Sequence, residues 1–530
     1  MDDLTCKDAD RRPTDGQPRP QFRREELEDF RMLTRLGRLS AMLLGLAVLS
    51  GISCVADASS VPLPANAPWF NVSRPLEPRD LRGRVVLLDF FTPGCINCIH
   101  MLPEMTRLER AFGGRLLILG VDSPKFDASR DAKNIQAFIQ RYHVTHPVLI
   151  DEGMTLWDHY GVEAWPTLVL LGPQGGVVRT FIGEGHDAAI ARAISTTLSR
   201  AERTRELATG RLPLQPLAVN PNGLLQPGKV AVSARYVAIS DTGHNRIVLL
   251  NHQGRVLRVF GTGGPGHVDG PAGIAQFHEP EGLAFAGDSL YVADTGNSLI
   301  RCIDLASNTV KTIAGNGHRA FGGGPVKVGR DAELNSPWAL KVLGHTLLIA
   351  MAGDHQLWSM NLATGGIGPY AGDGLEGISN GPRASASFAQ SSGLAYHAGT
   401  LYVADPEASA VRAVDLRTGY VHTLIGKGLF VFGLRNGIAA DALLQHDQGL
   451  AWDDGKLYIA DTFNDAVRVL DPVTSRVATL ASGLSQPGGV AAFGPRDLLV
   501  ANTGDDDIVR LSLRDGVVHA WPVKGLPPAH

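Results

Sequence analysis

Two cysteines, Cys95 and Cys98, stand three positions apart and are the residues of this sequence best suited to chemistry. They follow a short apolar run, residues 84–91, that predicts a buried strand, and they open a helical pattern that continues to about residue 112. Unpaired N–H groups and the macrodipole at a helix N-terminus favour an anion, so Cys95 is expected to attack as a thiolate. Cys98, one turn further on, can resolve a mixed disulfide within the chain. We therefore predict that Cys95 is the nucleophile, that Cys98 is the resolving thiol, and that the two form a redox-active disulfide.

A zinc site and a purely structural disulfide fit this cysteine pair less well. A structural zinc site needs four ligands, and the sequence holds no second Cys-x-x-Cys and no His-x-x-x-His pair. His100 lies nearby but stands alone, and it is interpreted as a residue of the helix surface. A purely structural disulfide across three positions would constrain little chain and contribute little stability. We predict no metal and no cofactor.

Strands and helices alternate over residues 61–200, which indicates one α/β domain. Apolar runs and helical periodicity predict the individual elements. The expected strands are residues 84–91, 116–121, 147–150, 167–171 and 177–181. The expected helices are residues 95–112, 134–142, 155–160 and 188–203. A Pro-containing stretch then predicts a linker over residues 201–218.

After the linker the helical pattern stops and one phrase recurs six times, at spacings of 41 to 57 residues. The copies begin at Tyr236, Leu290, Leu347, Leu401, Leu457 and Leu498. Repeats of this length, each with several short strands, indicate the blades of a β-propeller, and blades must pack radially because one blade cannot bury both of its faces. The prediction is an all-β propeller over residues 219–523, with a tail over residues 524–530.

Four of the six copies place Asp-Thr or Asp-Pro at the end of the repeated strand. This Asp is interpreted as a turn residue that accepts bonds from backbone N–H groups just ahead, because a motif present in nearly every blade serves the scaffold. The third copy has Met351-Ala352 where Asp-Thr is usual, so an irregular turn is expected in blade three.

Four features of the first domain resemble the thioredoxin superfamily, over about residues 61–199. They are Asp89 on the strand, the Cys-Ile-Asn-Cys pair, Pro103, and Trp165-Pro166-Thr167. The resemblance implies that Asp89 is a buried acid assisting proton transfer to the resolving cysteine and that Pro103 kinks the helix. It also implies that Pro166 is the cis-proline of a loop that packs against the disulfide and holds the substrate backbone, with Trp165 and Thr167 as its substrate-binding neighbours.

The first domain also departs from the superfamily pattern at the redox pair. Gly94 replaces the tryptophan usual before the first cysteine, and Ile96-Asn97 replaces Gly-Pro between the thiols. The dipeptide between the cysteines helps to set the reduction potential, so the superfamily's potential does not carry over and the direction of electron flow stays open.

The repeats resemble the NHL repeat, whose known fold is a six-bladed propeller. The resemblance rests on the phrase Tyr-Val-Ala-Asp-Thr-Gly-Asn at residues 291–297 and the Gly-Leu-Ala strand before it. A Cys-Ile-Asn-Cys thioredoxin-like domain fused to such repeats resembles the NHL-repeat-containing protein 2 family, over most of the chain after residue 61. That family implies this architecture more than a particular chemistry.

The first 60 residues are not expected to belong to either domain. Residues 39–55 carry no charge, three arginines precede them, and Ala56-Asp57-Ala58 follows with the small residues that suit a signal peptidase. The expectation is a disordered extension plus a signal peptide or uncleaved anchor, although a membrane span usually needs about 20 residues. A lipid anchor on Cys54 is the weaker option. The predicted location is exported, periplasmic or anchored facing the periplasm.

Composition narrows the choice of function. A net charge of −4 offers no basic surface for nucleic acid, and 44% hydrophobic with 19% charged residues is ordinary for a soluble protein. Five cysteines are too few for a disulfide framework. Isolated Cys302 is expected to be a small buried strand residue.

Three hypotheses of function follow. The first is an exported thiol–disulfide oxidoreductase acting on protein thiols and disulfides, with a protein partner on its propeller and membrane contact only through an N-terminal anchor. The second is a binding scaffold whose thioredoxin fold is vestigial. The third is a hydrolase or lyase centred on the propeller; it requires acids and histidines converging on the axis, and His244, His355 and His446 do not recur at matching blade positions.

Overall fold

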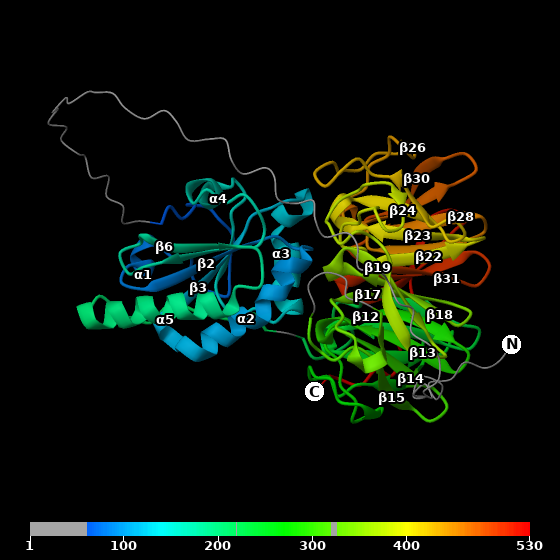
Figure 1. Cartoon of the computed structure of the whole chain (residues 1–530), viewed down its shortest axis with the longest axis horizontal. Coiled ribbons are helices and arrows are strands. Elements are labelled where there is room, and N and C mark those ends of the chain that lie inside the picture. Colours follow the sequence, from blue (N-terminus) through cyan, green and yellow to red (C-terminus); the bar gives the residue numbers. More distant parts are fainter. Residues whose placement is uncertain (1–60, 219, 320–325, 530) are drawn as a thin grey trace, which may run out of the picture.

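A computed structural model describes residues 61–218, 220–319 and 326–529, and shows a thioredoxin-like α/β domain seated on a β-propeller (Figure 1). The fold class predicted from the sequence is confirmed. The predicted signal segment, Cys6 and Cys54 lie outside the described residues. Within those residues, no helix is both long and apolar enough to cross a membrane.

The first domain is built on a six-stranded sheet in the order β1-β4-β3-β2-β5-β6. The strands are β1 Trp69–Phe70, β2 Val85–Phe91, β3 Leu116–Asp122, β4 Val148–Ile150, β5 Thr167–Leu171 and β6 Val177–Ile182. Strand β2 runs parallel to β3 and antiparallel to β5. All seven residues of β2 are buried, which explains why all of them except Asp89 are apolar.

Helices cover both faces of this sheet. They are α1 Pro78–Leu81, α2 Ile96–Phe112, α3 Ala132–Arg141, α4 Thr155–His159 and α5 Asp187–Thr204, with one-turn helices η2 Gly113–Arg115 and η3 Asp127–Arg130. Helices α2 and α5 share one apolar cluster with the sheet, whereas α4 packs into the cluster on the other face. Pro103 lies inside α2. Helix α3 lies at the junction with the propeller (Figure 1).

The segment that follows α5 stays on the first domain. The Ala208 N–H donates to the carbonyl of Gly83 at 2.7 Å, and the Gln215 N–H donates to that of Asn71 at 2.8 Å. The side chain of Asn71 also accepts from the N–H of Leu217 at 2.8 Å. The stretch predicted as a linker is therefore held along the thioredoxin-like domain before the chain enters the propeller.

The second domain is a ring of six antiparallel sheets, four strands each in the first and last blades and five in the others. Blades one to three are β7 Val230–Val232, β8 Val237–Asp241, β9 Arg246–Leu250, β10 Val256–Phe260; β11 Gly270–Pro271, β12 Pro280–Ala286, β13 Ser289–Asp294, β14 Leu299–Asp304, β15 Thr309–Ala314; and β16 Lys327–Val328, β17 Pro337–Leu343, β18 Thr346–Met351, β19 Gln356–Asn361, β20 Gly366–Ala371. Blades four to six are β21 Gly381–Pro382, β22 Gly393–His397, β23 Thr400–Asp405, β24 Ala410–Asp415, β25 Tyr420–Ile425; β26 Gly437–Ile438, β27 Gly449–Asp453, β28 Lys456–Asp461, β29 Ala466–Asp471, β30 Arg476–Ser482; and β31 Pro487–Phe493, β32 Asp497–Asn502, β33 Asp507–Ser512, β34 Val518–Ala520. Cys302 is a fully buried residue of β14.

One-turn helices complete the blades. They are η4 Thr242–His244, η5 Thr295–Asn297, η6 Gly329–Asp331, η7 Ala352–Asp354, η8 Pro406–Ala408, η9 Thr462–Asn464 and η10 Thr503–Asp505. The innermost strand of each blade lines a central channel.

The recurring Asp is a scaffold residue. In blade two, Asp294 accepts from the N–H of His278 at 2.8 Å, sixteen residues earlier, and pairs with buried Arg301 at 2.7 Å. The same backbone bond recurs in blades one, four and five. The carboxylate therefore ties an earlier loop of its own blade to the end of its strand, and its bond to the turn that follows comes from the side chain of Asn297, which donates to it at 2.9 Å.

The irregular turn expected in blade three is wrong. Residues Ala352–Asp354 form the same one-turn helix, and His355 closes it with φ 53°, as Ser298 does in blade two with φ 52°. Met351 replaces the Asp and accepts the N–H of Asn335 through its sulfur at 3.3 Å. The turn keeps its shape because the left-handed residue sets the backbone, not the carboxylate.

Hydroxyl groups join several blades to their neighbours. Thr295 donates to the carbonyl of Pro337 at 2.7 Å, and Thr503 of the last blade donates to Pro227 ahead of the first at 2.8 Å. Lys524 in the predicted tail also exchanges backbone bonds with the first blade. These contacts join the last blade to the first and close the ring.

Candidate functional site

The cysteine pair lies at the start of α2. Cys95 is the N-cap of the helix, and its sulfur accepts the N–H of Cys98 at 3.3 Å. Both side chains are free thiols and are buried, at 6% and 3% exposure. A sulfur at this position faces the unpaired end of the helix, where an anion is favoured.

Asp89 of β2 is the acid that acts on this helix turn. Burial raises the pKa of Asp89 to about 6, and a weaker interaction with His146 opposes that change. Burial, together with the bond to Cys95, raises the pKa of the Cys98 thiol well above its usual value, and Asp89 adds to the rise. One carboxylate oxygen of Asp89 has no hydrogen-bond partner among the described residues. The predicted transfer of a proton from Cys98 to Asp89 stays a prediction.

The loop before β5 completes the site on the thioredoxin-like side. The Trp165–Pro166 peptide is cis, and Trp165 packs in the same apolar cluster as both cysteines. The Trp165 indole donates to the carbonyl of Ser123 at 3.0 Å. The hydroxyl of buried Thr167 donates to the carbonyl of Ala164 at 2.8 Å, so this side chain holds the loop in shape. Their role toward a substrate stays a prediction.

Replacing Asp89 with Asn is expected to slow attack by Cys98 about 100-fold at pH 7, because the proton acceptor is lost. In the wild-type protein this step should accelerate as the pH rises through about 6, and the variant should lack that rise. The free energy of unfolding should depend on pH in the opposite direction to the rate. Because folding raises the pKa of Asp89, the native state loses stability as the pH rises from about 4 to about 6, and Asn removes this loss.

Rapid-quench kinetics and denaturation across about pH 4 to 8 would test both effects. An unchanged pH profile in the Asp89→Asn variant would show that another group accepts the proton.

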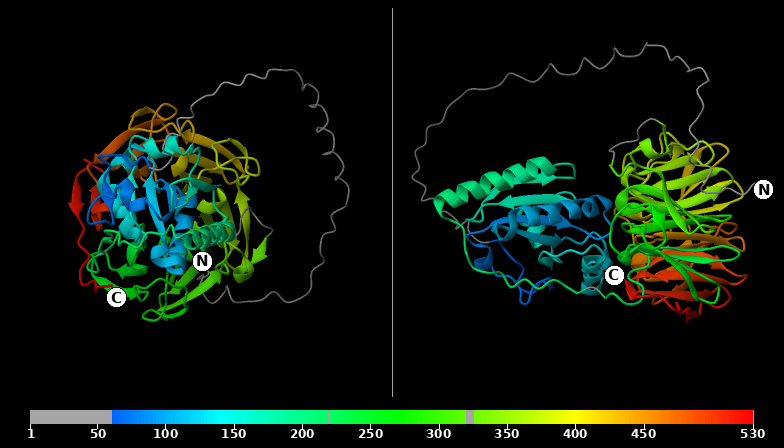
Figure 2. Two further views of the ribbon diagram at one scale, coloured as in Figure 1. Left: turned by 90° about the vertical axis from the view of Figure 1, so that its left-hand side faces the viewer. Right: turned by 90° about the horizontal axis from the view of Figure 1, so that it is seen from below.

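The propeller faces the cysteine pair and helix α2 with a ring of six equivalent residues. One stands in each blade, in the loop before the innermost strand, with φ between 43° and 63°. These docking-ring residues are Gln226, Glu279, Ser336, Gln390, His446 and Gln486. The thioredoxin-like domain sits over the propeller face that carries them (Figure 2).

Two docking-ring residues meet the start of α2. The side-chain oxygen of Gln390 accepts the N–H of Ile96 at 2.8 Å, which is one of the donors left unpaired by the helix. The ring of His446 lies against Gly94, where a Cβ would stand 2.5 Å from the imidazole. Gly94 has φ +90°, so backbone and space both demand glycine here.

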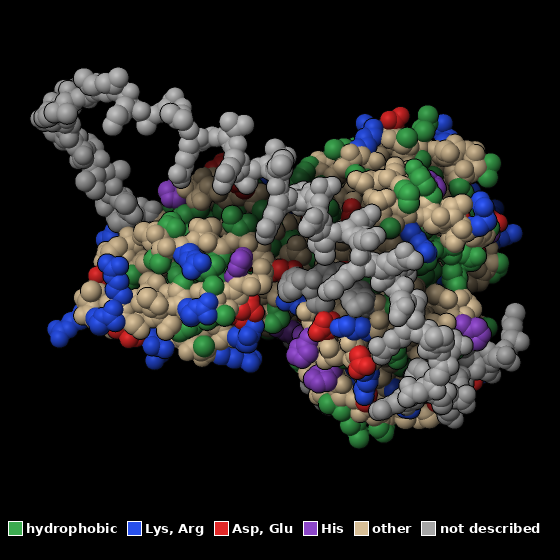
Figure 3. Space-filling model, viewed as in Figure 1, with side chains coloured by type: hydrophobic (Ala, Val, Ile, Leu, Met, Phe, Trp, Pro, Cys, Tyr) green, Lys and Arg blue, Asp and Glu red, His purple; other side chains and the backbone are tan. Residues whose placement is uncertain are grey.

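Two buried ion pairs also join the domains. Lys125 pairs with Glu407 of blade four, and the two side chains are 6% and 3% exposed. Arg141 of α3 pairs with Glu281 of blade two. Next to Lys125, Phe126 contacts rings of the propeller, including His446 at a centroid distance of 5.2 Å. Figure 3 shows Lys and Arg side chains over the outer face of the first domain, whereas these two pairs lie between the domains.

The interpretation of His100 as a surface residue is wrong. His100 is buried at the junction, where its Nδ1 lies 2.9 Å from Glu184 and its Nε2 lies 2.7 Å from the hydroxyl of Ser336. Burial lowers the pKa of His100, partly offset by Glu184. Its helical position gave no sign of these contacts, because Glu184 is far away in the sequence and Ser336 belongs to the other domain.

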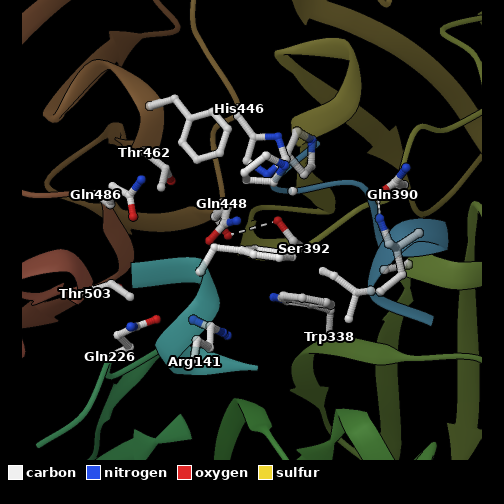
Figure 4. A pocket seen from close by; sticks show the side chains of 18 of the residues that line it. Arg141, Gln226, Trp338, Gln390, Ser392, His446, Gln448, Thr462, Gln486 and Thr503 are labelled. Carbon is white, nitrogen blue, oxygen red and sulfur yellow. Dashed lines mark hydrogen bonds between the residues drawn. The ribbon is translucent and has the colours of Figure 1, made fainter. Parts of the chain in front are cut away.

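A cavity of about 80 Å³ remains between the redox helix and the propeller axis. Its walls combine Ile96 and Ile99 of α2, Arg141 of α3 and the aromatic face of Trp338 (Figure 4). Side-chain amides line the propeller wall, with His446 beside them (Figure 4). This space admits a few water molecules but no folded protein.

The docking ring was missed from the sequence, although its signal was present. Four of the six residues stand three positions before a glycine, and four directly precede a proline. Each of the six meets at least one of these two conditions. The residue itself varies between blades, so a search for repeated chemistry passes over it.

The three histidines weighed for a propeller-centred enzyme occupy three different blade positions, as expected from the sequence. His244 ends the turn η4, His355 closes the turn after η7, and His446 belongs to the docking ring. Among the residues described, no group of three or more His, Cys, Asp or Glu side chains is arranged to hold a metal ion.

Comparison with known proteins gives matches to each part of the chain. The family described as thioredoxin-like matches residues 83–177. NHL repeat-containing protein 2 of Bos taurus is 35% identical over 515 residues, covering 87% of this chain and 71% of the relative. Thiol-disulfide oxidoreductase ResA of Bacillus thuringiensis is 31% identical over 133 residues, covering 24% of this chain and 75% of the relative. The crystal structure of a thioredoxin-like superfamily protein matches with a TM-score of 0.24 and 23% identity, covering 26% of this chain and 96% of that one.

Proposed function

The chain belongs to the NHL repeat-containing protein 2 family, and we propose that it is a thiol–disulfide oxidoreductase whose working groups are Cys95 and Cys98. One observation carries the proposal. The sulfur at the N-cap of a helix accepts the N–H of a second, buried cysteine, and a carboxyl group whose pKa is about 6 acts on that second thiol. The relative named as a thiol-disulfide oxidoreductase supports the same class of reaction.

The proposed reaction has two steps. The Cys95 thiolate attacks a substrate disulfide, forms a mixed disulfide and releases one substrate thiolate. Cys98 then gives its proton to Asp89 and attacks the Cys95 sulfur, which releases the second substrate thiolate and leaves a Cys95–Cys98 disulfide. Two electrons pass from the pair to the substrate, and the reverse sequence oxidises a dithiol. The substrates we propose are protein disulfides or dithiols.

We propose export as well, on the sequence pattern alone. The uncharged residues 39–55, preceded by arginines and followed by small residues, have the form of a signal segment. Terminal sequencing of protein from fractionated cells would test this. A mature N-terminus near residue 58 in an exported fraction is expected, and a full-length chain confined to the cytosolic fraction would refute it.

The oxidoreductase assay uses the reduced full-length chain and a peptide with one disulfide. Cys95→Ser is expected to abolish peptide reduction, whereas Cys98→Ser should accumulate a mixed disulfide on Cys95 that mass spectrometry detects. Thr106→Ser is the matched control on the same helix, because it keeps the hydroxyl that donates to the carbonyl of Leu102 and should leave the rate unchanged. If Cys95→Ser reduced the peptide as fast as the wild-type protein, the scaffold hypothesis would stand instead.

A further inference from the structure

We propose that the propeller is a lid on the redox site, and that a protein disulfide reaches Cys95 only when the two domains separate. This inference rests on the proposed function and concerns access to the same thiols. It begins from burial: the two cysteines are only 6% and 3% exposed, and the residues on either side of Cys95, Gly94 and Ile96, contact the propeller. Attack on a disulfide requires the Cys95 sulfur to meet another sulfur directly.

The contacts of the lid surround the reactive turn. Gln390 occupies the Ile96 N–H beside Cys95, and His446 stands against Gly94 on its other side. His446 thus fills the space before the first cysteine, where Gly94 contributes no side chain. The cavity that remains is too small for a polypeptide segment.

The composition of the junction favours a lid that opens. Apart from a small apolar group around Ile96 and Trp338 and the rings around Phe126, its contacts are amides, hydroxyls and ion pairs. A buried ion pair is close to neutral in net free energy, because desolvation offsets attraction. Domains joined by a polar interface are expected to move relative to one another.

Substitutions at the two buried ion pairs should shift the equilibrium between the closed and open arrangements of the two domains. In the closed state Lys125 and Glu407 are shielded from water and pair through one oxygen of the carboxylate, while in an open state both side chains would be solvated. Reversing one charge leaves two like charges in contact when the lid is closed. The single reversal therefore shifts the equilibrium toward the open state, and reversing both charges restores the closed state.

The test measures access to Cys95 in the reduced full-length protein. Two reagents are used, iodoacetamide and a maleimide carrying a polyethylene glycol chain, and peptide mapping follows the modification of Cys95 alone. The large maleimide is expected to react with Cys95 at least tenfold faster in Lys125→Glu and in Glu407→Lys than in the wild-type protein. The double reversal should return toward the wild-type rate. The small reagent should show a weaker dependence on these variants.

A matched control reverses a charge at an exposed pair within one blade. Arg510 lies 3.2 Å from Asp497, and Arg510→Glu should leave the labelling of Cys95 unchanged. The Arg141–Glu281 pair supplies an independent second cycle if a Glu407 variant does not fold.

The lid proposal would be overturned if the large reagent labelled Cys95 equally fast in the wild-type protein and in both single reversals. It would also be overturned if Cys95 of the double variant were labelled no more slowly than Cys95 of the single variants. Alkylation reports thiol access and not electron transfer. The lid proposal can therefore be supported even if the protein does not reduce the peptide, and it can be refuted even if the protein does.

Discussion

Replacing Arg301 with Met is expected to destabilise the propeller by about 3–5 kcal/mol, the cost of leaving a buried charge without its partner. Arg301 is fully buried and binds Asp294 at 2.7 Å and Asp269 at 2.9 Å. Burial raises the pKa of Asp294, and the attraction of Arg301 opposes that rise. Without Arg301, Asp294 must either stay charged in an apolar surrounding or take up a proton.

Denaturant titration followed by propeller fluorescence would measure this loss. Blade six shows the compensated arrangement, since it carries Asn502 and Val509 where blade two carries Asp294 and Arg301. The double variant Asp294→Asn with Arg301→Met removes both charges and keeps the oxygen that accepts the loop N–H, so it should recover much of the stability. Arg510→Met, at an exposed pair, should cost less than about 1 kcal/mol. A loss for Arg301→Met as small as that control would contradict this prediction.

Replacing Gly94 with Ala is expected to destabilise the docked arrangement by about 2–4 kcal/mol, through left-handed strain and overpacking together. The new methyl group would stand 2.5 Å from the ring of His446, at a backbone φ of +90°. Part of the cost therefore arises inside the first domain and part against the propeller.

Gly113→Ala separates these two contributions. Gly113 ends α2 with φ +54° and ψ −146° and has nothing within 4 Å of its Cβ position, so its variant should show backbone strain alone, about 1–3 kcal/mol. Adding His446→Ala should relieve Gly94→Ala but not Gly113→Ala, as measured by thermal and denaturant unfolding. If the two glycine variants lost equal amounts of stability, the His446 side chain would have moved away from the new methyl group without a measurable loss of free energy.

Local patterns in the sequence predicted each domain well. The apolar run that became β2 and the periodic segment that became α2 placed Cys95 at a helix start, as the structure shows. The six repeats predicted six blades because each copy builds the same unit. Asp89 was located through the resemblance to the thioredoxin superfamily, and the structure adds the physical reason for its raised pKa, which is burial.

What the sequence could not predict lies between the domains. His100 has the surroundings of a surface residue within its own helix, and it is buried between Glu184 of its own domain and Ser336 of the propeller. The variation among Ser336, Gln390 and His446 resembles drift in a repeat until the thioredoxin-like domain is placed against them. Short-range patterns carry no information on which surfaces far apart in the chain will meet.

The closed ring of blades has a consequence for how its guest is oriented. The six loops share one backbone conformation and form a nearly sixfold-symmetric surface. On such a surface the thioredoxin-like domain could bind in six equivalent orientations. The unlike side chains at the docking positions remove this degeneracy, because a hydroxyl, an amide and an imidazole each match a different point on the guest. Because the blades have diverged at these positions, one of the six possible rotations of the thioredoxin-like domain on the propeller is favoured over the other five.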